Sequence, residues 1–548
     1  MAIDYTWNGS AGSAWDNTAN WTSTGGTFPN AAGDTATIPL AASIALNGAK
    51  TVGALTLNGT TGTINVGNGV TTDSLFFDNT GGAANSDGNS NPSILSAGTA
   101  TNVISAPVRI GNSGAATLQI LQTSINSLNL SGGLRLDSTT AGGNNALAVI
   151  NNLTGSATLD VGDVTSISTV TPTAGITNTI RFGNANNSTT TNWGTINLNG
   201  VISNGAQVGG FNVTTGVVYG AGAASNTNNS IATINIKGAN TYSGATQLFR
   251  ANIVLGTDTP FGTSTVQSGS GFQGNLTGAN LFSDNDARTI TNNFSLARNI
   301  SFKGTNSLKL AMVNGFVSSN TIFVFNMISP NKTLTLGAPT SFVSTATTDA
   351  GRILTFDGSG TTIIDGKIIN NLGSTSLTAV PTDAGTEGRI SKAGLGLLKI
   401  TNSANTFKAY AAASGGIMEF TNAGATSSAW MALNPGGAIG VDTGSLAIVP
   451  ARLAASNVAA NQVNKGSIAL ATADATTDIN YVTDTNLSTA QAIQTSIGAL
   501  PGGVTYTGTI TPAASTYRLG GGDVLTLPNN NALAGCAAWS PRTAARSR

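Results

Sequence analysis

Short runs of alternating apolar and polar residues recur along the whole 548-residue chain. Leu128-Asn-Leu130, Ile196-Asn-Leu198 and Leu398-Lys-Ile400 are typical examples. Each run places two aliphatic side chains on one face of an extended segment and a polar side chain on the other. Asn-Gly and Gly-Gly turn signals separate the runs. This pattern predicts short β-strands that are joined by tight corners.

Two architectures combine short strands with frequent turns, namely a sandwich or barrel and a solenoid. A sandwich closes at about 100 residues, whereas the pattern here continues through nearly the whole chain. We therefore predict an all-β fold, a parallel β-solenoid with irregular loops. The predicted parts are an N-terminal cap with the first strands (1–40), solenoid repeats (41–425), a C-terminal solenoid portion (426–534) and a tail (535–548).

One segment departs from the β pattern. Residues 488–499 place apolar side chains at Ile493 and Ile497, with Ser488 as an N-cap and Pro501 beyond the end. This spacing predicts one short amphipathic helix. The helix either covers part of the solenoid or binds a partner.

Charged residues make up only 8% of the chain, against about 25% in ordinary domains. Equivalent positions on successive turns of a solenoid lie about 4.8 Å apart, so a column of identical charges would repel itself. A column of Asn or Thr side chains can instead form hydrogen bonds along the stack. We expect amide and hydroxyl columns on the outside and stacked aliphatic side chains inside.

The composition also excludes several kinds of chemistry. The chain has no His and a single Cys, Cys536, so it has neither a Ser-His-Asp triad nor a thiolate zinc site. Its net charge is zero, which argues against binding to nucleic acid. We predict that the protein is not an enzyme, and we assign no catalytic, cofactor-binding or metal-binding residue and no cofactor.

Carboxylates supply the strongest argument for an enzyme, because glycoside hydrolysis needs two acids about 5–10 Å apart. The candidate pairs are Asp284 with Asp286 and Asp357 with Asp365. Each member of the second pair precedes a glycine, and Asp-Gly usually forms a turn.

Calcium is a weak further possibility. Residues 85–91 (Asn-Ser-Asp-Gly-Asn-Ser-Asn) offer oxygen ligands at alternate positions, but they contain one carboxylate. Asp284-Asn-Asp286 is a similarly weak candidate, and we expect solvated loops rich in Asn and Asp rather than calcium sites.

Three tryptophans, Trp7, Trp15 and Trp21, cluster near the N-terminus. They can form a sugar-binding platform or cap the open end of the core. We expect a cap, because the first turn of a solenoid has no preceding turn to cover it.

Gly238-Ala-Asn-Thr-Tyr-Ser-Gly244, preceded by alternating residues 233–236, resembles the autotransporter-associated β-strand repeat. A second, degraded copy spans 388–407, where Phe407 replaces the Tyr. Segments 5–9, 15–21, 32–38, 503–512 and 516–522 are similar to parts of large bacterial secreted proteins that carry this repeat. The resemblance implies a right-handed parallel β-helix on the cell surface or beyond it, and it implies no catalytic residue.

Two classes of function follow. The first is an exported structural or adhesive β-solenoid, a passenger domain that binds a host surface, a glycan or another copy of itself in fibres or layers. The second is a carbohydrate-active β-helix, either a polysaccharide hydrolase or lyase or a tailspike-like glycan binder.

The ends of the chain differ from those of complete family members. Residues 1–5 lack the basic start and apolar core of a signal peptide, and no run of about 18 apolar residues could span a membrane. Residues 535–548 change abruptly in composition. They read as a non-native or unstructured tail, or as a sorting signal that is cleaved.

Overall fold

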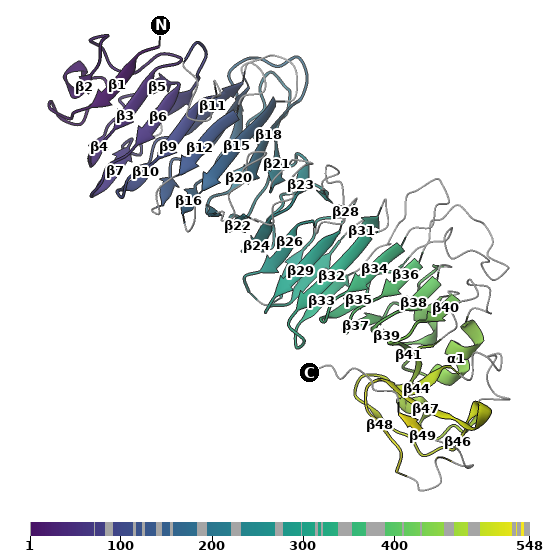
Figure 1. Ribbon diagram of the computed structural model, residues 1–548. Helices are drawn as coiled ribbons and strands as arrows, with labels where there is room; N and C mark the ends of the chain where they lie inside the picture. Colours follow the sequence, from purple (N-terminus) through teal and green to yellow (C-terminus); the bar gives the residue numbers. More distant parts are fainter. Residues whose placement is uncertain are drawn as a thin grey trace. The chain divides into compact units, whose positions relative to one another are not determined.

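The protein is all-β in the computed structural model (Figure 1). The chain divides into two compact units, Met1–Asp284 and Asn285–Arg548. The boundary between them lies inside the range 41–425 that was predicted as one solenoid. The structure describes residues 2–541 except 71, 83–90, 113–116, 123–126, 139–144, 154–156, 184–193, 221–231, 269–277, 286, 297–298, 313–315, 319–321, 338–352, 369–388, 408–409, 428–429, 454–464, 481–493, 529–532 and 534–538.

The first unit contains three sheets. In spatial order, the first sheet holds β2 (Trp21–Thr22), β1 (Asp4–Trp7), β3 (Thr35–Ile38), β6 (Ala54–Leu57), β9 (Ser93–Ser96), β12 (Thr117–Gln122), β15 (Asn145–Leu153), β18 (Ile176–Gly183), β21 (Val213–Tyr219), β23 (Thr246–Leu248) and β25 (Val266–Ser268). The second holds β4 (Ala42–Ile44), β7 (Thr63–Val66), β10 (Thr101–Ile104), β13 (Leu128–Leu130), β16 (Thr158–Val161), β19 (Thr195–Leu198), β22 (Thr233–Ile236), β24 (Asn252–Leu255) and β26 (Asn280–Ser283). The third holds β5 (Ala49–Val52), β8 (Ser74–Phe77), β11 (Val108–Asn112), β14 (Leu134–Ser138), β17 (Val164–Ser168) and β20 (Ile202–Ser203).

The order of these strands is that of a coil. From β3 to β19 each strand pairs in parallel with the strand three places further along the chain, so the chain visits the three sheets in turn. After β21 it alternates between the first two sheets. This connectivity confirms the predicted parallel β-solenoid.

Alternation within each strand builds the core. Leu159, Ile196, Ile234 and Ile253 are register partners on β16, β19, β22 and β24, and all four are buried. Each aliphatic side chain therefore packs on its counterparts in the turns before and after it. Full burial of such a side chain contributes about 1.5–3 kcal/mol, so stability accumulates with each turn.

The tryptophan cluster lies at the first edge of this stack. Trp7, Trp15 and Trp21 are buried, and the Trp21 ring packs edge-on against the other two at 5.0 and 4.8 Å. The Trp15 indole N–H donates to the Pro29 carbonyl at 2.8 Å. Strand β2 runs antiparallel to β1 beside the 3₁₀ turn η1 (Thr18–Asn20). The three buried rings therefore lie where the first turn has no preceding turn to cover it.

The second unit is also built of stacked parallel strands. One sheet holds β27 (Arg288–Ile290), β30 (Leu308–Ala311), β33 (Thr333–Gly337), β35 (Thr361–Ile364), β37 (Leu397–Ile400), β39 (Gly416–Phe420), β41 (Gly437–Val441), β42 (Ser467–Leu470), β44 (Ser496–Ala499), β47 (Tyr517–Gly522) and β49 (Trp539–Pro541). Another holds β29 (Ile300–Gly304), β32 (Ile322–Ile328), β34 (Ile353–Asp357), β36 (Arg389–Lys392), β38 (Tyr410–Ala413) and β40 (Trp430–Leu433). The shorter pairs are β28 (Phe294–Leu296) with β31 (Phe316–Ser318), β43 (Ile479–Asn480) with β46 (Ile510–Thr511), and β45 (Val504–Thr505) with β48 (Leu525–Thr526). The described residues of this unit also form the 3₁₀ turns η2 (Ala423–Thr426), η3 (Thr472–Asp474) and η4 (Ala513–Ser515).

The α-helix that the structure describes is α1 (Ser445–Arg452), which follows β41. The buried carboxylate of Asp474 accepts hydrogen bonds from the backbone N–H of Ser445 at 2.8 Å and of Leu446 at 3.4 Å. A carboxylate at this end satisfies free N–H groups and complements the helix dipole. These bonds therefore stabilise the N-terminal end of the helix.

The helix predicted over 488–499 is wrong at its C-terminal end, where Ser496–Ala499 form strand β44; residues 488–493 lie outside the described part. Ile497 pairs with Ile468 of β42, and all four residues of β44 are buried. A strand that is covered on both faces shows no alternation of polar and apolar residues. The helical spacing of the apolar residues was therefore misleading.

The C-terminal tail also differs in part from the prediction. Trp539–Pro541 form β49 beside β47, with Tyr517 opposite Trp539. These three residues are therefore not unstructured, because their backbone pairs with the last strand of the stack.

The two segments that were interpreted as copies of one repeat share an inter-turn contact. The Asn240 carbonyl oxygen accepts from the N–H of Ile202 at 2.7 Å, and its amide donates to the Pro260 carbonyl at 2.7 Å. Asn405 does the same with Ile368 and Ala425, at 2.8 and 2.9 Å. Each buried Asn therefore joins the preceding turn of the solenoid to the following one.

Glycines allow the corners of successive turns to approach closely. A methyl group added to Gly238 would lie 1.9 Å from the carbonyl oxygen of Gly200, the corner glycine one turn earlier. No real side chain tolerates that distance. The close stacking of successive corners therefore requires glycine at position 238, which follows Lys237 and lies against Gly200 of the Asn199-Gly200 corner.

A charge inside the core should be strongly destabilising. Leu198 is 1% exposed, so Leu198→Asp should lower the free energy of unfolding by about 3–5 kcal/mol, because the charge has no partner there. Urea unfolding followed by circular dichroism measures the change. Lys237→Asp, an exposed neighbour on the next turn, is the control, and an equal loss in both variants would contradict this placement of Leu198.

Removal of an inter-turn Asn should also destabilise each unit. Asn240→Ala and Asn405→Ala leave buried backbone groups unpaired, which costs about 1–3 kcal/mol each. The exposed neighbour Thr241 provides the control variant Thr241→Ala, for which we expect a change within about 0.5 kcal/mol. Urea midpoints compare the three, and Asn variants that unfold like the control would refute the bridging role.

Candidate functional site

An amide ladder runs along the outer face of the second sheet. Asp160, Asn197 and Asn235 are register partners on β16, β19 and β22. The Asn197 amide donates to the Asp160 carboxylate at 2.8 Å, and the Asn235 amide donates to the Asn197 carbonyl oxygen at 2.7 Å. The predicted outer column of hydrogen-bonded amides is therefore confirmed here, with one carboxylate at its head.

Two arginines are stacked in one column, and an acid and an aromatic ring lie beside one of them. Arg109 and Arg135 are register partners on β11 and β14. The Arg109 guanidinium contacts the Asp137 carboxylate, whose side chain is 1% exposed, and lies 5.3 Å from the centre of the Phe76 ring. The ion pair and the cation–π contact stabilise a pair of stacked arginines that would otherwise repel each other.

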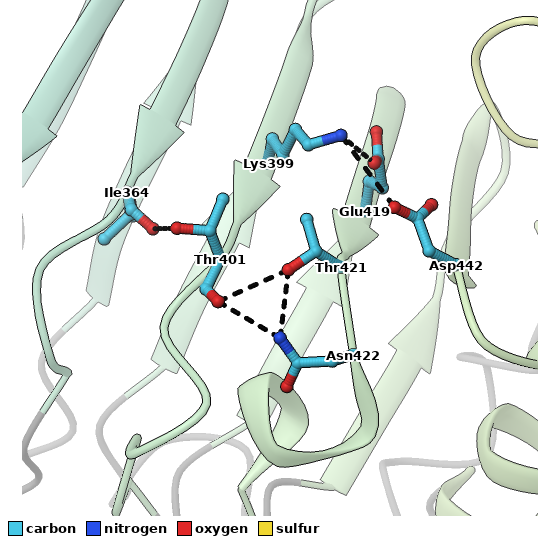
Figure 2. A network of polar contacts seen from close by, with 7 residues as sticks. All are labelled: Ile364, Lys399, Thr401, Glu419, Thr421, Asn422 and Asp442. Carbon is cyan, nitrogen blue, oxygen red and sulfur yellow. Dashed lines mark hydrogen bonds and ion pairs between the residues drawn. The ribbon is translucent and has the colours of Figure 1, made fainter.

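A cluster of charged groups lies on the outer face of the second unit (Figure 2). The Lys399 ammonium of β37 contacts the Glu419 carboxylate of β39 and lies 3.9 Å from the carboxylate of Asp442, which follows β41. Lys399 and Glu419 are register partners, so the ion pair runs along the stack. We name Lys399, Glu419 and Asp442 the Lys-Glu-Asp cluster.

Hydroxyl groups form a ladder beside this cluster (Figure 2). Thr401 donates to the carbonyl of Ile364, and Thr421 donates to the carbonyl of Thr401, both at 3.3 Å. The Asn422 amide also donates to the carbonyl of Thr401 at 3.1 Å, and its oxygen caps η2 by accepting from the N–H of Ala425 at 2.8 Å. These bonds hold three successive turns, those of β35, β37 and β39, in register beside the charged groups.

Glu419 is the least accessible member of the cluster. Its side chain is 4% exposed, whereas those of Lys399 and Asp442 are 33% and 40% exposed. The next residue in its column is Gly440, where an added methyl group would lie 2.6 Å from the Leu500 side chain. Leu500 belongs to an apolar cluster with Ala438, Ala469 and Ala471. Apolar side chains therefore cover the position that follows Glu419 in its column.

This environment favours the neutral form of the acid. Burial raises the pKa of the Glu419 carboxyl, and the nearby Asp442 carboxylate raises it further, while the Lys399 ammonium lowers it. The net direction is upward. Such a carboxyl group can accept and return a proton more readily near neutral pH than an ordinary glutamate can.

A second unusual group is a lysine in the core. Lys392 of β36 is buried, and its register partners are the buried Phe356 and Ala413. Its ammonium donates to the carbonyls of Ala393 and Gly394. Burial lowers the pKa of Lys392 to about 8, with a partial offset by Asp357. The sequence does not reveal this lysine, because Ile390-Ser-Lys392 does not show which face points inward.

The carboxylate pairs named from sequence fall in different places. Asp286 lies outside the described residues, and Asp284 follows β26 with its N–H donating to the Leu255 carbonyl at 3.2 Å. Asp357 ends β34, where it accepts from the N–H of Gly358 at 2.6 Å, and Asp365 follows β35 in another sheet. About 13 Å of extended chain in β35 separates these two turns.

The calcium candidate at 85–91 lies outside the described residues except Asn91. Among the residues that the structure does describe, no group of three or more Asp, Glu, Cys or His side chains could hold a metal ion. No helix in the same part of the chain is long and apolar enough to cross a membrane.

Sequence reasoning missed the Lys-Glu-Asp cluster. Its signal is weak but present, since Glu419 is one of two glutamates and lies between the apolar residues Met418 and Phe420. Only the register, which pairs Lys399 with a residue 20 positions away, brings the charges together.

Comparison with known proteins adds no relative. No family model matches the chain, and neither a curated protein nor a solved structure matches it significantly. The geometry and the sequence therefore carry the argument about function.

The buried lysine gives a pH-dependent prediction. A lysine whose pKa is lower in the folded state destabilises the fold below that pKa, and the penalty disappears as the pH rises from about 8 to 10.5. Lys392→Met should therefore raise the free energy of unfolding at pH 7, by up to roughly 3 kcal/mol, and should change it little at pH 10.5.

Urea unfolding at the two pH values measures the difference. The control is Lys309→Met, since Lys309 is exposed on β30. A Lys392→Met variant that is less stable at pH 7 would show that the bonds to the two carbonyls outweigh the cost of burying the charge.

Proposed function

We propose that this protein is an exported structural or adhesive module, a β-solenoid of the cell surface or extracellular matrix. The observation that carries the proposal is the use of its polar side chains. Asp160, Asn197, Asn235, Asn240 and Asn405 all bond between turns of the stack. These polar side chains therefore bond to other turns of the stack in each unit.

Export is part of the same proposal. A single Cys in 548 residues suits a protein that folds outside the reducing cytoplasm. The resemblance of residues 238–244 to the autotransporter-associated repeat supports the same location. The chain contains no His and few Lys or Arg residues, which suits an inert outer surface better than a regulated intracellular one.

An outward-facing strip on β32 supports the adhesive part of the proposal. Phe323 and Phe325 stack at 5.7 Å, and Met327, next on the same face, is 54% exposed. The register places Lys303 beside Met327 and Asp357 beside Phe325. Aromatic faces bordered by polar groups suit a glycan, a host surface or another copy of the chain.

Three measurements on the purified chain test this function together: sedimentation velocity, electron microscopy, and binding to surfaces coated with glycans or cells. We expect ordered assemblies or saturable binding. Met327→Lys should weaken that binding by about fivefold or more, whereas Leu395→Lys, at an equally exposed position, should not. A monomer that binds no surface would contradict the proposal.

A carbohydrate-active β-helix is the second candidate. The observation in its favour is the contrast between Glu419, a buried acid with a raised pKa, and Asp442, a carboxylate whose side chain is 40% exposed. Such a division suits a general acid and its partner. Release of reducing sugar or unsaturated uronate from mixed polysaccharides, lost in Glu419→Gln or in Asp357→Asn, would favour this candidate over the first.

A further inference from the structure

The Lys-Glu-Asp cluster has the composition of a condensation site. One amine faces two carboxyl groups, and the Glu419 carboxyl is the nearer of the two (Figure 2). Lys399 Nζ contacts Glu419 and is 3.9 Å from Asp442 Oδ2. An amide bond between amine and carboxyl needs these two groups and a third that moves protons, and all three are present.

The surroundings of each group suit a different role. Glu419 is 4% exposed and lies next in its column to Gly440, which the Leu500 side chain approaches, and its burial favours the neutral form. Asp442 is the more accessible carboxyl, so a water molecule can leave from it. The 3.9 Å distance joins Lys399 Nζ to Asp442 Oδ2, whereas attack requires Nζ to lie about 3–3.5 Å from Cγ. Rotation of the partly exposed Lys399 and Asp442 side chains can bring these two atoms together.

We propose that Lys399 and Asp442 condense into an intramolecular isopeptide bond, with Glu419 as the group that relays the protons. The bond joins Lys399 Nζ to Asp442 Cγ. It ties β37 covalently to the segment that follows β41, two turns further along the stack.

The step balances without a further reactant. Glu419 takes a proton from the Lys399 ammonium, and the freed electron pair on Nζ attacks Asp442 Cγ. The new C–N bond forms, and one Cγ–O bond breaks. The leaving oxygen receives the proton held by Glu419 and a second proton from the nitrogen, and departs as water. An ammonium and a carboxylate become one neutral amide and one water molecule.

Two physical effects favour the product. Well-oriented intramolecular groups react as if present at about 10⁵ M or more, which far exceeds the concentration of competing water. The ion pair that includes the buried Glu419 carboxyl also carries a desolvation cost, and a neutral amide does not. Lys309 provides the internal contrast, because it occupies the same column three turns earlier on β30, where the next positions are Thr335 and Ile363.

Intact-mass spectrometry of the full chain tests the proposal directly. We expect a mass lower by one water molecule than the sequence predicts, and a digest in which Lys399 and Asp442 belong to one branched peptide. The peptide that contains Lys309 should be unmodified. Fragmentation also separates this bond from dehydration at Asp357-Gly or Asp365-Gly, which loses the same mass within a linear peptide.

Variants assign the roles. Lys399→Arg and Asp442→Ala should restore the full mass, and Glu419→Gln, which cannot relay a proton, should restore it for most of the protein. Circular dichroism confirms that each variant is folded. A wild-type chain at full mass, a bond from Lys399 to Glu419, or complete condensation in Glu419→Gln would overturn the proposal.

Discussion

In-register parallel stacking is the constraint on which the remaining features of this protein depend. Each residue on a strand has one counterpart in the turn before and one in the turn after, about 4.8 Å away. Leu159, Ile196, Ile234 and Ile253 satisfy this constraint inside the core. Asp160, Asn197 and Asn235 satisfy it outside by bonding to one another. The same spacing selects glycine at the corners, because successive turns meet there backbone to backbone.

The constraint also explains the scarcity and the placement of charge. A charged side chain must find its partner within its own column or close beside it. Arg109 finds Asp137, and Lys399 finds Glu419. Lys392, which is buried in the core, donates to the backbone carbonyls of Ala393 and Gly394, and its burial lowers its pKa. The stacking of turns therefore brings the few charged side chains close enough to form specific ion pairs.

The sequence was sufficient for the strands and the core, because alternation in segments such as 196–198 and 234–236 reports directly which side chains are buried. It was not sufficient for register. The partnership of Lys399 with Glu419 depends on the length of the turn between them, and no local pattern encodes it. Ser496–Ala499 were misinterpreted as helix because a strand that is covered on both faces loses its alternation. The sequence also does not reveal that Lys392 is buried, because Ile390-Ser-Lys392 does not show which face of the strand points inward.

Disulfide trapping tests the stacking most directly. Asn197 and Asn235 are register partners on neighbouring turns, so their Cα atoms lie about 4.8 Å apart, within the range that a disulfide spans. In a chain with Cys536→Ser, oxidation of Asn197→Cys/Asn235→Cys should form an intramolecular disulfide, and Asn197→Cys/Thr233→Cys, displaced by two residues, should remain reduced. Free thiols in the first variant, or a disulfide in the second alone, would contradict the parallel in-register solenoid.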